Sequence, residues 1–286
     1  MTTSEISRVG FVGLGNIGKP MAERIAISPF ALTVFDHVPE PMRDLQALGA
    51  HAANSLGDLA ERSDLVAIVV QTTEQVRSVV LGEGGLLGSM RPGSIIAIHS
   101  TMSLSAIKEI GARCAARGVD VLDAAVSGGD VGARAGKLTF MIGGDDAVLE
   151  RCRTLFGHMA ANIFLLGDLG AGQAGKLANN LLYNAGVVAA VESMRLAVAA
   201  GIPENVAVSL LSVSTGTNFT IANWNRLMGE RQAPEDRERI AALRHKDVAL
   251  AIGMAKELGE EVALGQAVLD RIDWAIAHSR PGEAGA

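Results

Sequence analysis

Residues 9–18 read Val-Gly-Phe-Val-Gly-Leu-Gly-Asn-Ile-Gly, and this run indicates how the first half of the chain folds. Four residues typical of a buried strand lead into three glycines, and a segment typical of a helix follows from Lys19 to Ile27. A helix behind such a turn presents backbone N–H groups and its positive dipole end to an anion. Gly13 permits the tight turn, Gly15 lets the backbone approach a phosphate, and Gly18 lets the helix pack close to the strand. The motif predicts a dinucleotide pyrophosphate site formed by Gly13, Leu14, Gly15, Asn16, Ile17 and Gly18.

Asp36 directly follows the second predicted strand, Leu32–Phe35. Its distance from the glycines is about that of the acid which binds an adenosine ribose diol in dinucleotide-binding folds. The alternative interpretation is a turn or cap residue ahead of Val38 and Pro39. A carboxylate here repels a 2′-phosphate and no arginine follows it immediately, so we expect NAD rather than NADP as cofactor.

Composition limits the class of protein. A chain of 286 residues, 49% of them hydrophobic, is long enough for two domains with sizeable cores. The net charge of −6 and the absence of a basic cluster argue against nucleic acid or an anionic membrane as partner. The start of the chain is polar, and Asn184 interrupts the apolar stretch Leu181–Val191, so we expect a cytoplasmic protein. Cys114 and Cys152 lack metal-ligand spacing, which predicts packing roles and no metal site.

Strand-like and helix-like segments alternate up to residue 168, which predicts an α/β fold with a doubly wound, mostly parallel sheet. The predicted strands are 9–12, 32–35, 65–70, 94–98, 119–122, 138–142 and 162–165. From residue 169 onward the pattern is helical only, and it begins with a helix of about 30 residues, Ala171–Ala200. We therefore predict a dinucleotide-binding domain over residues 1–168 and an all-α domain over 169–286, joined by the long helix.

The long helix carries a stripe of polar side chains on an otherwise apolar background. Its members are Gln173, Lys176, Asn179, Asn180, Tyr183 and Asn184. One amine among amides, with no acid before Glu192, is unlike the charged face of an ordinary surface helix. The stripe predicts the lining of a cleft with Lys176 in a functional role; the alternative is a solvated lysine.

A second candidate segment, residues 123–133, follows the predicted strand that ends at Leu122. Small residues surround Ser127, and Gly128 and Gly129 follow it. Two successive N–H groups and a hydroxyl can hold a carboxylate. The alternative is a flexible turn without a ligand.

Three motifs occur in order along the chain: the glycine run 13–18, Asp-Ala-Ala-Val-Ser-Gly-Gly at 123–129, and Gly-Gln-Ala-Gly-Lys-Leu-Ala-Asn-Asn at 172–180. Together they resemble the β-hydroxyacid dehydrogenases, which include 3-hydroxyisobutyrate dehydrogenase and tartronate semialdehyde reductase, over nearly the whole chain. The resemblance implies a Rossmann-type domain similar to that of 6-phosphogluconate dehydrogenase and a helical C-terminal domain used in dimerisation. It also implies a homodimer or homotetramer and the reversible, NAD-dependent oxidation of a small 3-hydroxy acid or reduction of its semialdehyde.

The resemblance also implies roles for single residues. Lys176 matches the catalytic lysine, a general acid and base, and Asn180 the substrate-holding asparagine one turn later. A free lysine has a pKa of about 10.4, so base catalysis near neutral pH requires burial to lower it. Ser127, Gly128 and Gly129 match the loop that binds the substrate carboxylate.

The cofactor residues implied by the resemblance are Val70, Gln71, Thr101 and Lys246. Thr101 matches a threonine beside the nicotinamide, and Lys246, which Asp247 accompanies, matches a late lysine that reaches the cofactor. Val70 and Gln71 replace a Leu-Pro pair that often ends the fourth strand, so Gln71 adds a polar group there.

Other positions leave alternatives open. His99 stands where an acid is common, either as a contact of the substrate or cofactor or as a structural residue. Asn218, Phe219 and Trp224 lie where relatives place substrate-pocket residues, and Trp224 is equally compatible with helix packing. No second basic cluster accompanies the proposed carboxylate loop, so we expect a small, uncharged substituent on the substrate.

Two rival functions remain at this point. The first is an imine reductase of the same fold, against which Lys176 and Asp36 both count. The second is a dinucleotide-binding scaffold without catalysis, which would not need to keep a set of four residues together: Lys176, Asn180, Ser127 and Thr101.

Overall fold

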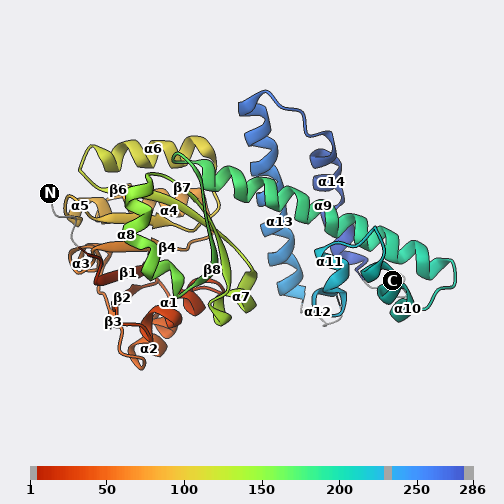
Figure 1. The fold of residues 1–286 in the computed structure, drawn as a ribbon, viewed down its shortest axis with the longest axis horizontal. Helices are drawn as coiled ribbons and strands as arrows, with labels where there is room; N and C mark the ends of the chain where they lie inside the picture. Colours follow the sequence, from red (N-terminus) through yellow and green to blue (C-terminus); the bar gives the residue numbers. More distant parts are fainter. Residues whose placement is uncertain (1–4, 229–233, 280–286) are drawn as a thin grey trace. The chain divides into compact units, whose positions relative to one another are not determined.

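A computed structural model describes residues 5–228 and 234–279 of the chain (Figure 1). The chain divides into two compact units, and the division falls between Lys176 and Leu177, inside one helix. The predicted domain boundary after residue 168 stays a prediction. Each unit is described by itself below.

The first unit contains an eight-stranded sheet of order β3-β2-β1-β4-β5-β6-β7-β8. Neighbouring strands are parallel except β6 and β7, which are antiparallel. The strands are β1 (Arg8–Val12), β2 (Ala31–Phe35), β3 (His51–Ala52), β4 (Leu65–Ile68), β5 (Ile95–Ile98), β6 (Asp120–Ser127), β7 (Leu138–Gly143) and β8 (Ala160–Gly167). The chain leaves β1 for one side of the sheet and later returns to its other side with β4. The prediction of a doubly wound, mostly parallel sheet is confirmed.

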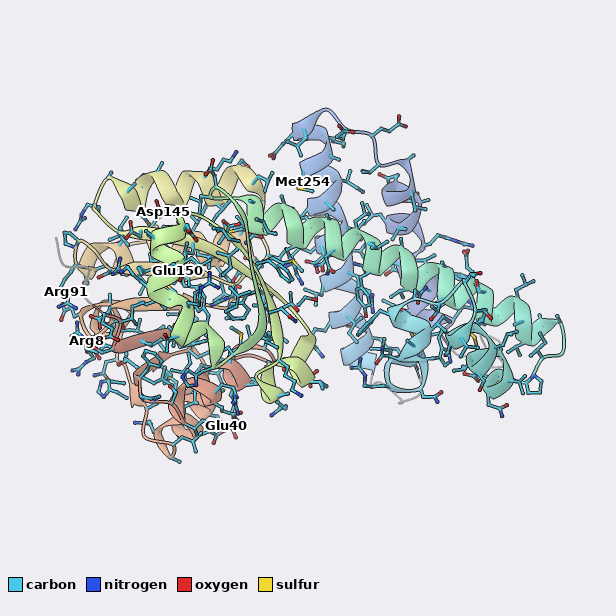
Figure 2. The ribbon with its side chains drawn as sticks, viewed as in Figure 1. Arg8, Glu40, Arg91, Asp145, Glu150 and Met254 are labelled. Atoms are coloured by element: carbon cyan, nitrogen blue, oxygen red, sulfur yellow. The ribbon has the colours of Figure 1, made fainter. Side chains whose placement is uncertain are left out.

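Both faces of this sheet are buried, which explains the uninterrupted apolar runs of its strands. Successive residues of β4 alternate between two clusters, with Leu65 and Ala67 in one and Val66 and Ile68 in the other. The helices of this unit are α1 (Gly18–Ala26), α2 (Pro39–Gln46), α3 (Leu56–Glu61), α4 (Thr73–Leu81), α5 (Leu86–Ser89), α6 (Leu104–Ala115), α7 (Gly129–Ala135) and α8 (Asp146–Gly157). Asp145 caps α8 by accepting the backbone N–H groups of Ala147 and Val148 (Figure 2).

One strand prediction was wrong at its end, and one short strand was not predicted. β6 does not end at Leu122 but continues to Ser127, because it pairs with β5 on one side and with β7 on the other. The expected loop of residues 123–133 is therefore a strand followed by the short helix α7. The two-residue strand β3 is too short to leave a sequence pattern.

The second unit is all-helical in the part that the structure describes, as predicted. After α9 (Ala171–Ala199), most of which lies in this unit, come α10 (Glu204–Val213), α11 (Phe219–Ala222), α12 (Trp224–Met228), α13 (Pro234–Leu258) and α14 (Ala263–Ala277). Its core contains Val191, Met194, Val248 and Ile272. Trp224 is 2% exposed in this core, and its indole N–H donates to Glu204 Oε1 at 2.8 Å. Trp224 is therefore a packing residue.

Helix α9 is long and apolar enough to cross a bilayer when judged by length and composition alone. One such helix is weak evidence for a membrane-spanning segment, because a buried core helix of a soluble protein passes the same test. The expectation that the chain has no membrane partner stays a prediction.

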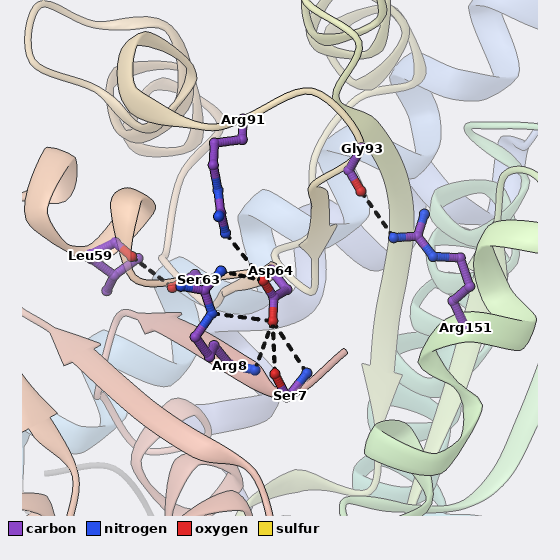
Figure 3. Close-up of polar contacts among 8 residues, drawn as sticks. All are labelled: Ser7, Arg8, Leu59, Ser63, Asp64, Arg91, Gly93 and Arg151. Carbon is purple, nitrogen blue, oxygen red and sulfur yellow. Dashed lines mark hydrogen bonds and ion pairs between the residues drawn. The ribbon is translucent and has the colours of Figure 1, made fainter. Parts of the chain in front are cut away.

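An ion-pair cluster holds the amino ends of β1 and β4 (Figure 3). Asp64 accepts hydrogen bonds from the backbone N–H groups of Ser7 and Arg8 at 3.3 and 3.0 Å. The Arg8 and Arg91 guanidinium groups, which lie on the same side of this unit in Figure 2, donate to Asp64 Oδ1 at 2.5 and 3.2 Å. Partial burial acts against the charge of Asp64, but the hydrogen bonds from Arg8 and Ser7 hold the pKa of its carboxyl below the usual range.

Candidate functional site

The glycine loop between β1 and α1 has the geometry of an anion cradle. Gly13 has φ +91°, and a Cβ there would collide with the carbonyl of Val69. A Cβ on Gly18 would collide with the carbonyl of Gly13, whereas one on Gly15 would meet no atom within 4 Å. No side chain caps the N-terminus of α1. These residues fit a dinucleotide, because the glycines bring bare backbone and an open position to the start of a helix.

Asp36 fixes this loop from the neighbouring strand. Its Oδ2 accepts the backbone N–H of Leu14 at 2.6 Å, and its Oδ1 accepts that of Val38 at 2.8 Å. The cap-residue interpretation is therefore correct for part of its role. Each carboxylate oxygen accepts more than one hydrogen bond, so the same side chain is compatible with a ribose diol. Ribose recognition by Asp36 stays a prediction.

Four segments with predicted site residues follow the carboxyl ends of adjacent parallel strands. The glycine loop follows β1, Val70 and Gln71 follow β4, Thr101 follows β5, and Ser127 ends β6. Val70 is held there because its N–H donates to the Ser100 hydroxyl at 2.8 Å. Ligands of open α/β sheets bind at this edge, where the strand order reverses. The fold thus brings these segments to one edge.

A buried carboxylate joins this edge to the start of α9. Asp123, in β6, is fully buried, and it accepts the N–H groups of Gly170 at 2.8 Å and Gln173 at 2.6 Å. Burial raises the pKa of Asp123 to about 6, and the backbone hydrogen bonds counteract only part of that rise. The carboxylate thus anchors the first turn of α9 to the sheet.

The Gln173 side chain extends the same network to the loop after β5. Its Oε1 accepts the N–H of Met102 at 3.0 Å, and its Nε2 donates to the carbonyl of Ser100 at 2.9 Å. These two bonds bracket Thr101. Asp123 and Gln173 therefore fix the positions of the Thr101 loop and of the lysine one turn into α9. Sequence reasoning assigned Asp123 no role, although an acid inside an apolar strand was a signal for one.

Lys176 lies at the end of β6. Its Nζ donates to the carbonyl of Val126 at 2.7 Å, one residue before Ser127. Gly128 and Gly129 follow with φ +126° and +64°, backbone angles that side chains disfavour. The fold thus places the amine beside the serine-glycine turn, and Lys176 is not a solvated surface lysine.

In the helical unit, Asn180 belongs to a second polar network. Its Nδ2 donates to Asp247 Oδ2 at 2.8 Å, and its Oδ1 accepts from Asn179 at 3.2 Å. Asn180 is 5% exposed, so these bonds fix the orientation of its amide. Lys246 Nζ lies 3.6 Å from Asp247 Oδ1. Asp247 therefore links the predicted substrate asparagine to the predicted cofactor lysine within this unit.

His99 is a structural residue. It is 3% exposed, its Nδ1 lies 2.6 Å from the carbonyl of Ala124, and its ring packs against Phe140 and Phe156. Burial lowers its pKa to about 4, so the imidazole is neutral at physiological pH. The Ala124 carbonyl is one residue from Asp123, so His99 supports the strand that carries the buried carboxylate.

No group of three or more potential metal ligands occurs among residues 5–228 and 234–279. Cys114 and Cys152 are both buried, and burial raises the pKa of their thiols to about 11 and about 12. Both pack inside the core clusters of the sheet unit, as predicted.

Two family models match nearly the whole chain. Residues 8–167 match the NAD binding domain of 6-phosphogluconate dehydrogenase. Residues 170–284 match a family described as NAD-binding of NADP-dependent 3-hydroxyisobutyrate dehydrogenase. The NAD-binding fold predicted from the glycine run is thereby confirmed.

Characterised relatives and solved structures agree with these matches. An NAD-dependent L-serine dehydrogenase of Pseudomonas aeruginosa is 36% identical over 90% of this chain and 87% of its own. A probable mitochondrial 3-hydroxyisobutyrate dehydrogenase of Dictyostelium discoideum is 33% identical over 93% of this chain and 84% of its own.

The structure of a Mycobacterium tuberculosis 3-hydroxyisobutyrate dehydrogenase with L-serine superposes with a TM-score of 0.82 at 29% identity, covering 96% of this chain and 95% of that one. An imine reductase from Myxococcus stipitatus gives a TM-score of 0.67 at 18% identity over 97% of this chain and 96% of its own, which shows a shared fold only.

Proposed function

Because the chain belongs to the β-hydroxyacid dehydrogenase family, oxidoreductases that act on hydroxy acids, we propose that it interconverts a small 3-hydroxy acid and its aldehyde with NAD. Lys176 acts as the general acid and base in this proposal. The observation that carries it is the 2.7 Å hydrogen bond from Lys176 Nζ to the Val126 carbonyl, which holds the amine beside Ser127. A lysine elsewhere on α9 would have no carboxylate-binding turn next to it.

Substrate binding is assigned to the turn after β6 and to α9. The Ser127 hydroxyl and the N–H groups of Gly128 and Gly129 hold the substrate carboxylate. Asn180, whose amide is fixed by Asp247, orients the substrate. Hydrogen bonds to a charged group contribute about 1.5–3 kcal/mol each, enough to select a carboxylate over a neutral ester.

The chemical step moves a hydride, which is two electrons with one proton, from carbon to one acceptor and the hydroxyl proton to another. Bound NAD supplies the hydride acceptor, and the carbon that bears the hydroxyl is oxidised. Lys176, as a neutral amine, takes the hydroxyl proton; in the reverse direction its ammonium protonates the alkoxide oxygen. The Asp123 and Gln173 network keeps the lysine in place during both directions.

We also propose that the enzyme prefers NAD to NADP. The Asp36 carboxylate lies at the end of β2 against the glycine loop, where its charge opposes a 2′-phosphate. Lys246, Val70, Gln71 and Thr101 are the further cofactor contacts in this proposal. The ratio of kcat/KM for the two cofactors measures the preference directly.

The decisive experiment is the Lys176→Ala variant, assayed with a panel of 3-hydroxy acids. We expect turnover to fall by about 10²-fold or more while NADH binding, followed by fluorescence, stays nearly unchanged. Lys256→Ala is the matched control, because Lys256 is an exposed lysine of the helical unit. Near-normal turnover in Lys176→Ala would refute the assignment.

We propose further that the enzyme is a homo-oligomer that associates through the helical unit. On α9, Leu182 is 77% exposed and Leu196 73% exposed, and α10 ends with Val213, which is 86% exposed. Leu182 and Leu196 are fourteen residues apart and share one face of the helix. Light scattering measures the mass of the wild type and of Leu196→Glu, and a monomeric wild type would refute the proposal.

A further inference from the structure

The Gln173 side chain, in the first turn of α9, is fully buried in the sheet unit, which extends to Lys176. Its Oε1 accepts the backbone N–H of Met102 at 3.0 Å, and its Nε2 donates to the backbone carbonyl of Ser100 at 2.9 Å. The amide thus uses its acceptor and its donor on two residues of one loop. Only one orientation satisfies both partners, because a rotated amide would set oxygen against oxygen and N–H against N–H.

These two bonds hold the loop between β5 and α6, which contains Thr101. The Thr101 hydroxyl itself has no hydrogen-bond partner within residues 5–228 and 234–279, so it does not fix the loop. Ser100 also accepts the N–H of Val70 through its hydroxyl at 2.8 Å. The Gln173 amide is therefore connected to the loops after β4 and β5, both of which carry predicted cofactor contacts.

The backbone of the same turn is tied to the strand beside the lysine. The Gln173 N–H donates to Asp123 Oδ2 in β6 at 2.6 Å. Lys176 lies three residues later, at a neighbouring position on the same helix face, and its Nζ donates to the Val126 carbonyl of β6 at 2.7 Å. The start of α9 is thus held at two points of β6 and, through the Gln173 amide, at the loop after β5.

We propose that Gln173 is a positioning residue of the dehydrogenase reaction. Its amide keeps the Thr101 loop and the start of α9 in one fixed arrangement, so that the nicotinamide and the Lys176 amine reach the reacting carbon together. The inference rests on the proposed function and deepens it, because Thr101 and Lys176 have the roles proposed above. Without the amide the loop and the helix shift independently, and a shift of about 1 Å at a reacting group costs about 10² in rate.

Gln173→Met removes the two hydrogen bonds and keeps a flexible side chain of similar length. We expect kcat for a 3-hydroxy acid to fall by about 10- to 100-fold, and KM for NAD to rise by about threefold or more because the Thr101 loop is released. KM for the hydroxy acid should change by less than about threefold, since Ser127 is held by the pairing of β6 with β7. Steady-state kinetics measures all three constants.

Gln173→Glu separates positioning from packing through its pH dependence. An ionised carboxylate accepts from Met102 but sets its second oxygen against the Ser100 carbonyl, whereas a protonated carboxyl donates to that carbonyl as the amide does. Burial and the nearby Asp123 carboxylate raise the pKa of the introduced acid above the usual value of about 4.3. We expect kcat relative to the wild type to rise by about tenfold or more between pH 8 and pH 5.5. The same ratio for Gln173→Met should stay constant.

Other titratable side chains lie on the elements that pack here. They are Asp123 in β6, His99 after β5, Lys176 in α9 and Lys108 in α6, whose Cε lies close to Gly170. All four are present in the wild type and in both variants. The ratio of the variant kcat to the wild-type kcat at each pH therefore isolates the introduced acid.

Ser63→Ala is the matched control for lost stability. The Ser63 hydroxyl is also fully buried in the sheet unit, and it donates to the Leu59 carbonyl at 2.6 Å near the amino end of β4 (Figure 3). We expect this variant to unfold at a lower urea concentration than the wild type, with kcat changed by less than about twofold. Urea unfolding of all variants shows that they are compared as folded proteins.

Each outcome decides the question. A kcat within about threefold of the wild type in Gln173→Met, or a pH-independent ratio in Gln173→Glu, would overturn the inference and leave the proposed function intact. A loss of kcat in Ser63→Ala as large as that in Gln173→Met would also overturn it, because general destabilisation would then explain both. Near-normal turnover in Lys176→Ala would overturn the proposed function and this inference together.

Discussion

Asp64 and Asp123 are carboxylates of the same sheet, and they serve opposite ends of it. Asp64 precedes β4 at the amino ends of the strands and is surrounded by the guanidinium groups of Arg8 and Arg91 (Figure 3). Asp123 lies inside β6, forms no ion pair within the described part of the chain, and is held by the backbone N–H groups of Gly170 and Gln173. The pKa of the first is lowered, whereas that of the second is raised to about 6.

The difference separates a structural carboxylate from a positioning one. Ion pairs at the amino ends tie two strands together, at the edge of the sheet opposite the one where ligands of open α/β sheets bind. At the carboxyl ends, a buried carboxylate held by backbone N–H groups anchors the helix that carries Lys176. Burying the charge of Asp123 costs free energy, and this cost occurs at the place where the side chain of Lys176 has to be held in position.

The largest effect that this comparison predicts is on turnover. Asp123→Asn keeps the shape of the side chain but has only one acceptor oxygen, so one of the two N–H groups from Gly170 and Gln173 loses its partner. The first turn of α9 then shifts, and a shift of about 1 Å at a catalytic group costs about 10² in rate. We expect kcat to fall by about 10²-fold with NADH binding retained, measured by steady-state kinetics and fluorescence titration. Normal kcat in this variant would contradict the positioning role.

The next effect is on the pH dependence of stability. The folded pKa of Asp123, about 6, lies above its ordinary value of 3.8, so its contribution is present at low pH and is lost as pH rises toward 6. The folded pKa of His99, about 4, lies below its ordinary value of 6.5, so its contribution is present above 6.5 and is lost as pH falls toward 4. Because one pKa unit corresponds to 1.36 kcal/mol, each group contributes about 3 kcal/mol to the free energy of unfolding. The two contributions change with pH in opposite directions.

Single substitutions should therefore reveal opposite slopes between pH 4 and 6. In His99→Gln we expect the free energy of unfolding to fall more steeply as pH rises than in the wild type, because the opposing contribution of His99 is removed while that of Asp123 remains. In Asp123→Asn we expect the free energy of unfolding to rise more steeply with pH than in the wild type, because the opposing contribution of Asp123 is removed while that of His99 remains. Urea unfolding at several pH values measures both slopes, and curves parallel to that of the wild type would contradict the assignment of the two groups.

The smallest effect on activity is expected from a substitution of Asp64, at the amino ends of the strands. Asp64→Asn weakens the hydrogen bonds from Ser7, Arg8 and Arg91, so the free energy of unfolding at neutral pH should fall by about 1–2 kcal/mol. The lowered pKa of Asp64 means that this stabilisation is present above its ordinary pKa and is lost as pH falls through the folded value. We expect kcat to change by less than about twofold. A large loss of activity would show that the two ends of the sheet are coupled.

Local patterns in the sequence were sufficient for much of the fold and for several site residues. The apolar run before Gly13 and the glycines themselves predicted the dinucleotide loop, because a turn with positive φ requires glycine. The polar stripe identified Lys176 and Asn180, because helical periodicity places residues three and four apart on one face. The continuation of β6 to Ser127 escaped prediction, because a strand of small residues such as Ala124 and Ala125 shows no clear pattern before its partners are known.

The sequence by itself therefore determined which residues form the glycine turn, most strands of the sheet and the long helix with its polar stripe. Each of these features depends on the spacing between residues that are near neighbours in the chain. The contacts of Asp123 with Gln173, of Lys176 with Val126, and of Arg244 with Asn184 join residues 50 to 60 positions apart. Only the tertiary structure brings such pairs together. A side-chain hydrogen bond needs its two atoms within about 3 Å of each other, and the packing of helices and strands decides which atoms come that close.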